Sequence, residues 1–335
     1  QSLNIPTIMF DVPWVSDRLL LFHDIPGGSR ALCKALQDNK GQHFTLADLS
    51  PDLVSYHRLY TDATRDTTPA YTKVFKDRFW GFKNEVWRRF RLALGAILDG
   101  SIFTKVFYFI VKRFRPNLRK EYACFEMNPD FNQPFVYVPL AFQPEASTSP
   151  LGDMFVDQIL MIETLAMALP PGWLIYVKEH PAQWWLRGGI NYSSNRYSGY
   201  YRRIAQIPSV RFVPVTTDTY RLLQHSQAVA LATGTAGWEA VLRLKPALVF
   251  GYPWYRDVPE LFRVSDVESC KNAFHKIVDG FIPSEASLLN YLKCFDQSTI
   301  HGYFETIAGQ KPVLTKEESM MNIIQAIINA LNHVN

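Results

Sequence analysis

Three short polar segments, each placed directly after an apolar run, carry residue types suited to binding an anion and moving a proton. They are residues 143–145 (Gln-Pro-Glu), residues 178–180 (Lys-Glu-His) and residues 233–235 (Thr-Gly-Thr). The first offers a carboxylate, the second an imidazole, and the third hydroxyl and backbone N–H donors. Their order and placement make them the candidates for a functional site.

The Thr-Gly-Thr segment has the clearest physical rationale. A helix is predicted to begin near Ala236, so the free N–H groups of its first turn and its positive end face whatever lies there. Gly234 lets a ligand approach the backbone, and the Thr233 and Thr235 hydroxyls add donors, which suits a phosphate or a carboxylate. Glu239, one turn into the helix, is placed to accept hydrogen bonds from ribose hydroxyls. The alternative is a capped helix with no ligand.

Glu145 and His180 are the candidates for chemistry in the other two segments. Glu145 follows Pro144, which stiffens its approach. A carboxylate at a cleft rim can act as a general base, or as the nucleophile in retaining glycosyl transfer. The alternative is an ordinary exposed glutamate, which the loop composition by itself favours. His180 can donate to a phosphate, although a single histidine in such a loop is more often structural.

The elements that must position these segments alternate between strands and helices. Strands are predicted over residues 135–140, 174–178 and 228–232, one before each polar segment, with helices over 152–169 and 198–207. This alternation favours a parallel, doubly wound sheet. Ligands bind at the carboxyl edge of such sheets. We therefore expect the three segments to converge on one cleft.

Composition and motifs narrow the function classes. The 335 residues, of which 47% are hydrophobic and 20% charged, indicate a globular chain of two domains. No apolar run reaches the length of about 20 residues that spans a bilayer. The sequence lacks D-x-D, metal-site spacing, and the glycine-rich and G-x-S-x-G motifs, so we expect no metal and no resident cofactor. With no recognisable signal peptide and four scattered cysteines, we expect free thiols and a cytoplasmic protein.

Positive charge is concentrated in one segment. Residues 73–120 hold thirteen Lys or Arg against three acidic residues, whereas the whole chain carries a net charge of only +4. A basic, aromatic-rich segment can lie on anionic lipid or hold an anionic polymer. The alternative is a solvated helical face. No recognised nucleic-acid-binding motif accompanies the charge, so nucleic acid is not an expected partner.

The three segments together resemble the bacterial capsule polysaccharide biosynthesis family, which includes β-Kdo transferases. That family shows a QP-type motif, an HP motif and a G-[TS]-x-x-x-E-A segment that leads into a K-P strand. Here the motifs stand as Gln143–Pro144–Glu145, His180–Pro181, and Gly234–Thr235 through Glu239–Ala240 to Lys245–Pro246. The order and spacing agree over roughly residues 135–255, about a third of the chain.

The resemblance implies a GT-B fold, α/β with two Rossmann-like domains and an inter-domain cleft. The sequence pattern itself predicts a helix-rich N-terminal domain and a C-terminal helix. We predict an N-terminal acceptor-side domain over 1–133 and a nucleotide-sugar-binding domain over 134–335. The resemblance places His180 and residues 233–235 at the phosphate of a CMP donor. Lys178 and Glu179 would lie with His180 in the wall of the donor site on the phosphate side. It places Glu145 near a catalytic acidic residue, beside Gln143.

The function predicted from this resemblance is a metal-independent glycosyltransferase. Its donor would be a CMP-activated Kdo-like or nonulosonic sugar acid. Its acceptor would be an oligosaccharide or a lipid-linked glycan, reached through a peripheral contact with the anionic inner membrane face. Two alternatives remain. One is a GT-B enzyme or an epimerase that uses a UDP- or GDP-sugar, and the other is a non-catalytic polysaccharide-assembly protein.

Overall fold

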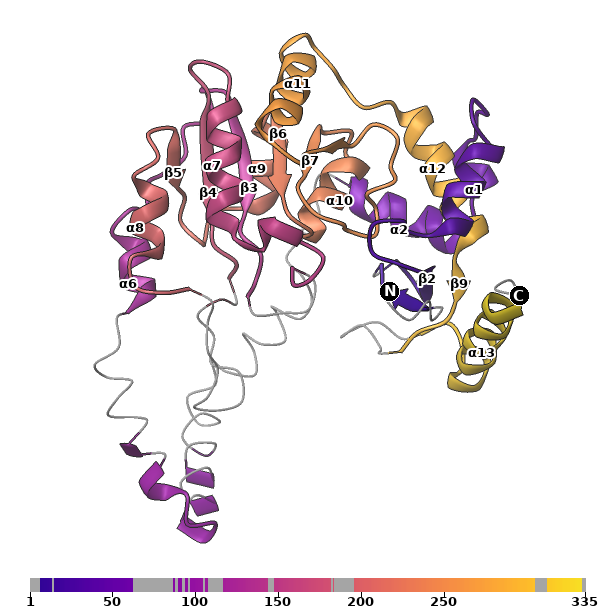
Figure 1. Ribbon diagram of the computed structural model, residues 1–335, viewed down its shortest axis with the longest axis horizontal. Coiled ribbons are helices and arrows are strands. Elements are labelled where there is room, and N and C mark those ends of the chain that lie inside the picture. Colours follow the sequence, from indigo (N-terminus) through magenta and orange to yellow (C-terminus); the bar gives the residue numbers. More distant parts are fainter. Residues whose placement is uncertain are drawn as a thin grey trace.

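The computed structural model describes most of the chain, and all structural statements below concern those residues. They are residues 7–13, 15–62, 87, 90–91, 94–95, 97–104, 106–107, 117–143, 148–181, 183, 196–304 and 312–332. Figure 1 shows a sheet with its helices on one side of the molecule and a group of helices from both ends of the chain on the other.

A six-stranded parallel sheet forms the centre of the larger part. Its strand order is β5-β4-β3-β6-β7-β8, and every neighbouring pair is parallel. The chain runs outward from β3 through β4 to β5, then crosses to the other side of β3 and continues through β6 to β8. The strands are β3 (Phe135–Pro139), β4 (Leu174–Lys178), β5 (Val210–Phe212), β6 (Ala228–Leu231), β7 (Ala247–Val249) and β8 (Phe262–Arg263).

Helices cover both faces of this sheet. They are α6 (Leu118–Ala123), the 3₁₀ turn η2 (Asp153–Val156), α7 (Gln158–Ala168), α8 (Tyr200–Ala205), α9 (Thr219–His225), α10 (Thr235–Leu242) and α11 (Val267–Val278). The helix predicted over 152–169 is interrupted at Asp157. Its side chain accepts hydrogen bonds from the N–H groups of Ile159 and Leu160, so α7 begins there.

The central strand β3 shows why a parallel sheet forms. Its first four residues are β-branched or aromatic and are buried on both faces, as expected where helices lie on each side. Val136 and Val138 pack in a core with α7, α8 and α11. Phe135 and Tyr137 pack in a second core, which also takes in residues of α1, α2, α10 and α12. The second core therefore joins the two ends of the chain to the sheet.

The N-terminal elements are bound to C-terminal ones. They are β1 (Met9–Asp11), β2 (Arg18–Phe22), α1 (Arg30–Asp38), η1 (Leu46–Asp48) and α2 (Pro51–Thr61), and their C-terminal partners are α12 (Glu285–Ser298) and β9 (Ile300–His301). β2 lies between β1 and β9 in an antiparallel sheet. Arg18, almost fully buried, forms ion pairs with Asp52 of α2 at 3.0 Å and with Asp296 of α12 at 2.8 Å.

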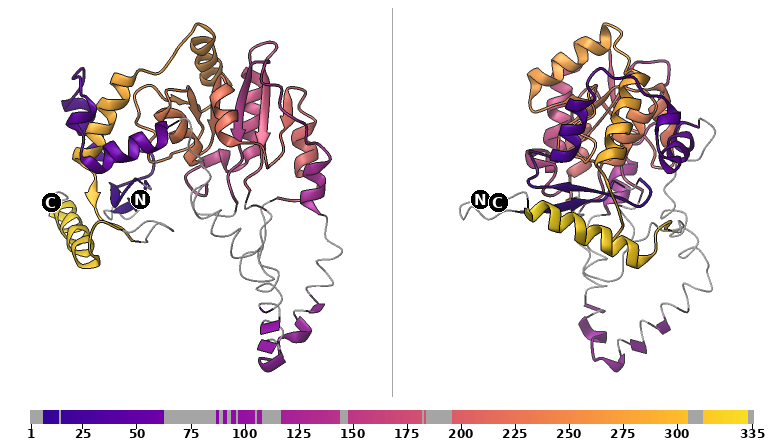
Figure 2. Two further views of the ribbon diagram at one scale, coloured as in Figure 1. Left: turned by 180° about the vertical axis from the view of Figure 1, so that it is seen from behind. Right: turned by 90° about the vertical axis from the view of Figure 1, so that its right-hand side faces the viewer.

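The predicted α/β class and doubly wound sheet are confirmed, and the predicted C-terminal helix is α13 (Lys316–Asn332). This helix lies beside β9 and apart from the six-stranded sheet (Figures 1 and 2). Within residues 1–133, the described strands are antiparallel, so a second Rossmann-like domain stays a prediction, as does the boundary at 133. All four cysteines are free, as expected.

Candidate functional site

The crossover of the sheet defines where the candidate site lies. β3 and β6 are neighbours, but their connections leave in opposite directions, and crevices for ligands form at such switch points. The loop after β3 carries Gln143, and the loop after β6 carries residues 233–235. The loop after β4, with residues 178–180, lies next to them. The structure therefore confirms that the three segments leave the same sheet edge.

A fully buried ion pair lies within the connection from β4 to α8. The Glu179 carboxylate and the Arg196 guanidinium are 2.9 Å apart (Nε to Oε2), and both side chains are inaccessible to solvent. Glu179 Oε2 also accepts from the Tyr201 hydroxyl at 2.6 Å, and Oε1 accepts from the His180 backbone N–H at 2.7 Å. Each carboxylate oxygen thus has partners, which a buried charge requires.

Arg196 extends this network to Gln143. Its Nη1 donates to Gln143 Oε1 at 2.6 Å, and its Nη2 donates to the Ala141 carbonyl at 3.0 Å. The Gln183 side chain forms two hydrogen bonds with the Gln143 backbone. Its Oε1 accepts from the Gln143 N–H at 3.0 Å, and its Nε2 donates to the Gln143 carbonyl at 2.7 Å. The Phe142 and His180 rings lie 5.5 Å apart. The Gln143 and His180 loops are therefore held in one fixed arrangement.

Lys178 faces away from this network. Its Nζ donates to the Thr217 carbonyl at 2.5 Å and to the Thr219 hydroxyl at 2.8 Å. Burial lowers the pKa of this amine to about 8, and the charge of Asp218 opposes the shift. The side chains of Lys178 and Glu179 both bond to groups within the protein, which suits a role in positioning the loops. Their predicted contact with a donor stays a prediction.

The loop after β6 places an open helix N-terminus at the switch point. Gly234 is the N-cap of α10, and no side chain caps the helix. The Thr233 hydroxyl is buried and has no hydrogen-bond partner among the described residues. Unpartnered N–H groups and an unsatisfied buried hydroxyl at one point suit an anionic ligand.

Two close contacts fix this helix end. The Tyr255 hydroxyl donates to the Gly234 carbonyl at 2.5 Å. A Cβ atom at position 237 would lie 2.3 Å from the same hydroxyl, so only glycine fits there. The loop after β3 also reaches this point, because a Cβ atom placed on Gly251 would lie 2.6 Å from the Leu151 carbonyl oxygen and 2.9 Å from the Thr233 methyl group. All three loops therefore meet at one edge.

Glu239 lies in a mostly buried position one turn into α10. Burial raises the pKa of its carboxyl to about 7, and Arg243, 4.0 Å away, opposes this shift only in part. Its charge is felt by the hydroxyl groups of Tyr56, Tyr137 and Tyr255, whose pKa values rise mainly through burial and in part through this carboxylate. Glu239 is therefore a carboxyl group that changes charge near neutral pH.

Sequence reasoning missed three members of the buried network: Arg196, Gln183 and Tyr201. Arg196 stands in a polar stretch without periodicity, and nothing in its neighbours indicates burial. The available signal was Glu179, because a carboxylate at the end of a buried strand requires a cationic partner. Glu145, the predicted catalytic carboxylate, lies outside the described residues, and its role stays a prediction.

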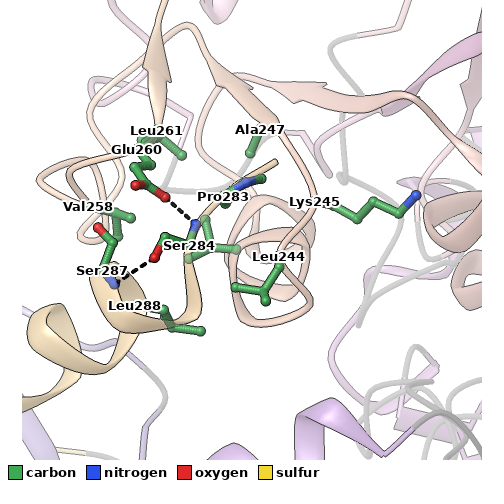
Figure 3. A pocket seen from close by; sticks show the side chains of 11 residues that line it. Leu244, Lys245, Ala247, Val258, Glu260, Leu261, Pro283, Ser284, Ser287 and Leu288 are labelled. Carbon is green, nitrogen blue, oxygen red and sulfur yellow. Dashed lines mark hydrogen bonds between the residues drawn. The ribbon is translucent and has the colours of Figure 1, made fainter. Parts of the chain in front are cut away.

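A small cavity lies at the opposite, amino edge of the sheet. Figure 3 shows it between Ala247, Leu244 and Leu288, beside Ser284, whose N–H bonds the Glu260 carboxylate. Its volume of about 10 Å³ admits no more than about one water molecule. A nucleotide cannot bind there, so the switch point remains the candidate site.

Comparison with protein families matches residues 148–261 to the family described as capsule polysaccharide biosynthesis protein. The matched residues include His180 and the whole segment from Thr233 to Glu239. The match confirms the resemblance that the sequence motifs indicate. No curated protein sequence matches the chain.

Several solved structures are distantly similar. The Thermosulfurimonas dismutans KpsC beta Kdo 2,7 transferase is 14% identical over 66% of this chain and 62% of that chain, with a TM-score of 0.36. The beta Kdo 2,4 transferase of the same protein is 18% identical over 58% and 52%, with a TM-score of 0.34. The UDP-GlcNAc 2-epimerase from Methanocaldococcus jannaschii is 10% identical over 55% and 48%, with a TM-score of 0.33. The chain spans less than two thirds of each, and similarities this distant identify no substrate.

We predict that Arg196→Gln destabilises the protein by about 3–5 kcal/mol, because the substitution leaves Glu179 as an unpaired buried charge. Urea unfolding measures the change. Arg203→Gln is the matched control: it breaks an exposed pair with Glu163, 3.1 Å long, and should cost about 0–1 kcal/mol. If both variants unfold at the same urea concentration, the buried pair does not hold the loops.

We predict that Glu239→Gln stabilises the protein at pH 8 but not at pH 4.5. The pKa of Glu239 is about 7 in the folded protein and takes the ordinary value of 4.5 in the unfolded chain. As the pH rises, the unfolded chain therefore loses this proton at a lower pH than the folded protein does. The stability contributed by the neutral carboxyl is complete below pH 4.5 and is lost as the pH rises through 7. At about 1.4 kcal/mol per pKa unit, the loss approaches ~3 kcal/mol. Urea unfolding across this range, with Glu163→Gln as control, tests this; a pH-independent difference would contradict it.

Proposed function

We propose that this protein is a glycosyltransferase that moves a Kdo-like or nonulosonic sugar acid from a CMP-activated donor to a surface polysaccharide or a lipid-linked glycan. The single observation that supports binding of a nucleotide-sugar phosphate is the uncapped N-terminus of α10 beside the buried Thr233 hydroxyl, at the switch point of the sheet. The choice of CMP and of a sugar acid rests on the resemblance of the sequence motifs. The match of residues 148–261 to the capsule polysaccharide biosynthesis family supports the class of reaction.

The donor phosphate is assigned to the N-terminus of α10. Backbone N–H groups and the helix dipole supply positive potential without a metal ion. The Thr233 hydroxyl gains the partner it lacks among the described residues, and Gly234 leaves the backbone open to the ligand. Glu239, one turn along the same helix, is assigned to the ribose hydroxyls. Its partial protonation near pH 7 would make donor binding depend on pH.

The transfer step needs a nucleophile, a leaving group and a base. The acceptor hydroxyl oxygen forms a bond to the anomeric carbon of the sugar acid, and the bond from that carbon to the CMP phosphate oxygen breaks. The leaving phosphate takes the bonding electrons and is stabilised by α10. The acceptor proton passes to a carboxylate, a role we assign to Glu145. His180, next to the buried Glu179–Arg196 pair, is assigned to the phosphate.

We place the reaction at the cytoplasmic face of the inner membrane, where a lipid-linked acceptor would be met. A UDP- or GDP-sugar transferase or epimerase is the competing assignment, because a helix N-terminus binds the phosphate of any nucleotide and does not distinguish the base. A non-catalytic assembly protein is the remaining one. Nucleotide binding and turnover separate these three functions.

We predict that CMP raises the thermal stability of the protein more than UDP or GDP does, and that EDTA leaves this effect unchanged. A ligand at 100 times its Kd contributes about 2.7 kcal/mol to the free energy of unfolding. Thr233→Val should reduce the shift because the buried hydroxyl is lost. Thr164→Val is the control, since the Thr164 hydroxyl bonds the Leu160 carbonyl within α7. A CMP shift that disappears in EDTA and returns with Mg²⁺ would refute metal-independent binding.

We predict that Glu145→Gln binds CMP nearly as wild type does but turns over a CMP-sugar about 100-fold more slowly, as expected when a general base or nucleophile is lost. Release of CMP from the donor in the presence of acceptor measures turnover. Glu163→Gln, on the exposed side of α7, is the control. Wild-type turnover in Glu145→Gln would move the assignment to another carboxylate, such as Asp153.

A further inference from the structure

Residues 94–107 form an apolar tip built on a tight turn. The described residues of this stretch, 94–95, 97–104 and 106–107, include helical residues on both sides of a turn at Asp99–Ser101. Gly100 has a φ of +71°, which suits glycine. The Asp99 carboxylate accepts from the Ser101 N–H at 2.9 Å and from its hydroxyl at 2.5 Å. These bonds set where one helical piece ends and the next begins.

This apolar tip exposes large hydrophobic side chains on both sides of the turn. Leu98 is 81% exposed before it and Phe103 is 83% exposed after it. The other exposed members are Leu94, Ile97, Val106 and Phe107. Neither hydrophobic core includes any of the six. Figures 1 and 2 show this stretch, in purple, at the end of the molecule remote from the six-stranded sheet. Such a cluster on a protein surface indicates an interaction site.

The charged residues that flank the apolar tip in the sequence favour one class of partner. Within residues 94–107 the charged residues are Asp99 and Lys105, whereas residues 88–91 contribute three arginines and residues 112–115 contribute one lysine and two arginines. An apolar stretch bordered by basic residues matches an anionic bilayer, with its hydrocarbon below and its phosphates at the surface. Two copies packed through this stretch would bring like charges together. A lipid surface is therefore favoured over self-association.

We propose that the apolar tip inserts into the interfacial region of an anionic membrane. Insertion is shallow, on the order of 5–10 Å, as for amphipathic interfacial segments. No described helix has the length and apolar character to cross the bilayer. The purpose of this insertion rests on the proposed function, because insertion would bring the cleft to a lipid-linked acceptor. Lipid binding itself needs neither donor nor turnover.

Sedimentation of the full chain with vesicles tests the proposal. Vesicles of equal parts phosphatidylcholine and phosphatidylglycerol should bind the wild type, and vesicles of phosphatidylcholine alone should bind it more weakly. The double variant Leu98→Ser with Phe103→Ser should lower the partition coefficient at least about tenfold, given the apolar area of these side chains. The matched control is Met167→Ser with Ile282→Ser, which removes similarly exposed apolar side chains elsewhere.

Salt separates the two parts of the interaction. Replacing Arg88, Arg89 and Arg91 with Ser should weaken binding mainly at low ionic strength, because screening already reduces these charges at high salt. The loss in the apolar double variant should persist at high salt. Every variant should keep the wild-type thermal midpoint and CMP response, so a lipid-binding defect is distinguishable from a failed donor site.

Three results would overturn the proposal. The first is a wild type that does not sediment with the anionic vesicles. The second is an apolar double variant that binds them as the wild type does. The third is concentration-dependent self-association, seen by light scattering, that the double variant abolishes while vesicle binding is unchanged. That last result would assign the apolar tip to a contact between copies.

Discussion

The buried pair between Glu179 and Arg196 is the constraint on which the candidate site depends. A carboxylate without solvent access must be matched by donors, and the guanidinium that matches it has donors left over. Those donors reach the Gln143 side chain and the Ala141 carbonyl. One electrostatic requirement at the end of β4 thereby fixes the loop after β3. The backbone of His180 is fixed by the same carboxylate.

The two sides of the switch point are built differently. On the β4 side, the polar groups satisfy one another and form a rigid wall. On the β6 side, the N-terminus of α10 has no side-chain cap, and the Thr233 hydroxyl has no partner in the described part of the chain. A site that is satisfied on one side and open on the other binds a ligand with little rearrangement, which favours affinity. The geometry thus separates polar groups that are already satisfied from polar groups that are open to a ligand.

Much of the C-terminal half follows from local sequence patterns. Short apolar runs bounded by polar residues predict the strands, and the parallel arrangement places their ends at one edge. Pairing between distant side chains has no such signal, so Arg196 could not be assigned to Glu179 from spacing. The same limit applies to β2 and β9, each short and far from its partner along the chain. The exposure of Leu98 and Phe103 was also hidden, because an apolar run does not reveal whether it is buried or exposed.

The pairing of β2 with β9 bears on the order in which the chain folds during synthesis. Arg18 bonds the Asp296 carbonyl across 278 positions of sequence, so the N-terminal elements cannot complete their packing until α12 and β9 have left the ribosome. The six-stranded sheet lies between them in sequence, so we expect it to form first. Contacts of such long range slow folding. The edge of β2 that β9 later covers would then be exposed while translation proceeds, and an exposed strand edge is open to pairing with another nascent chain.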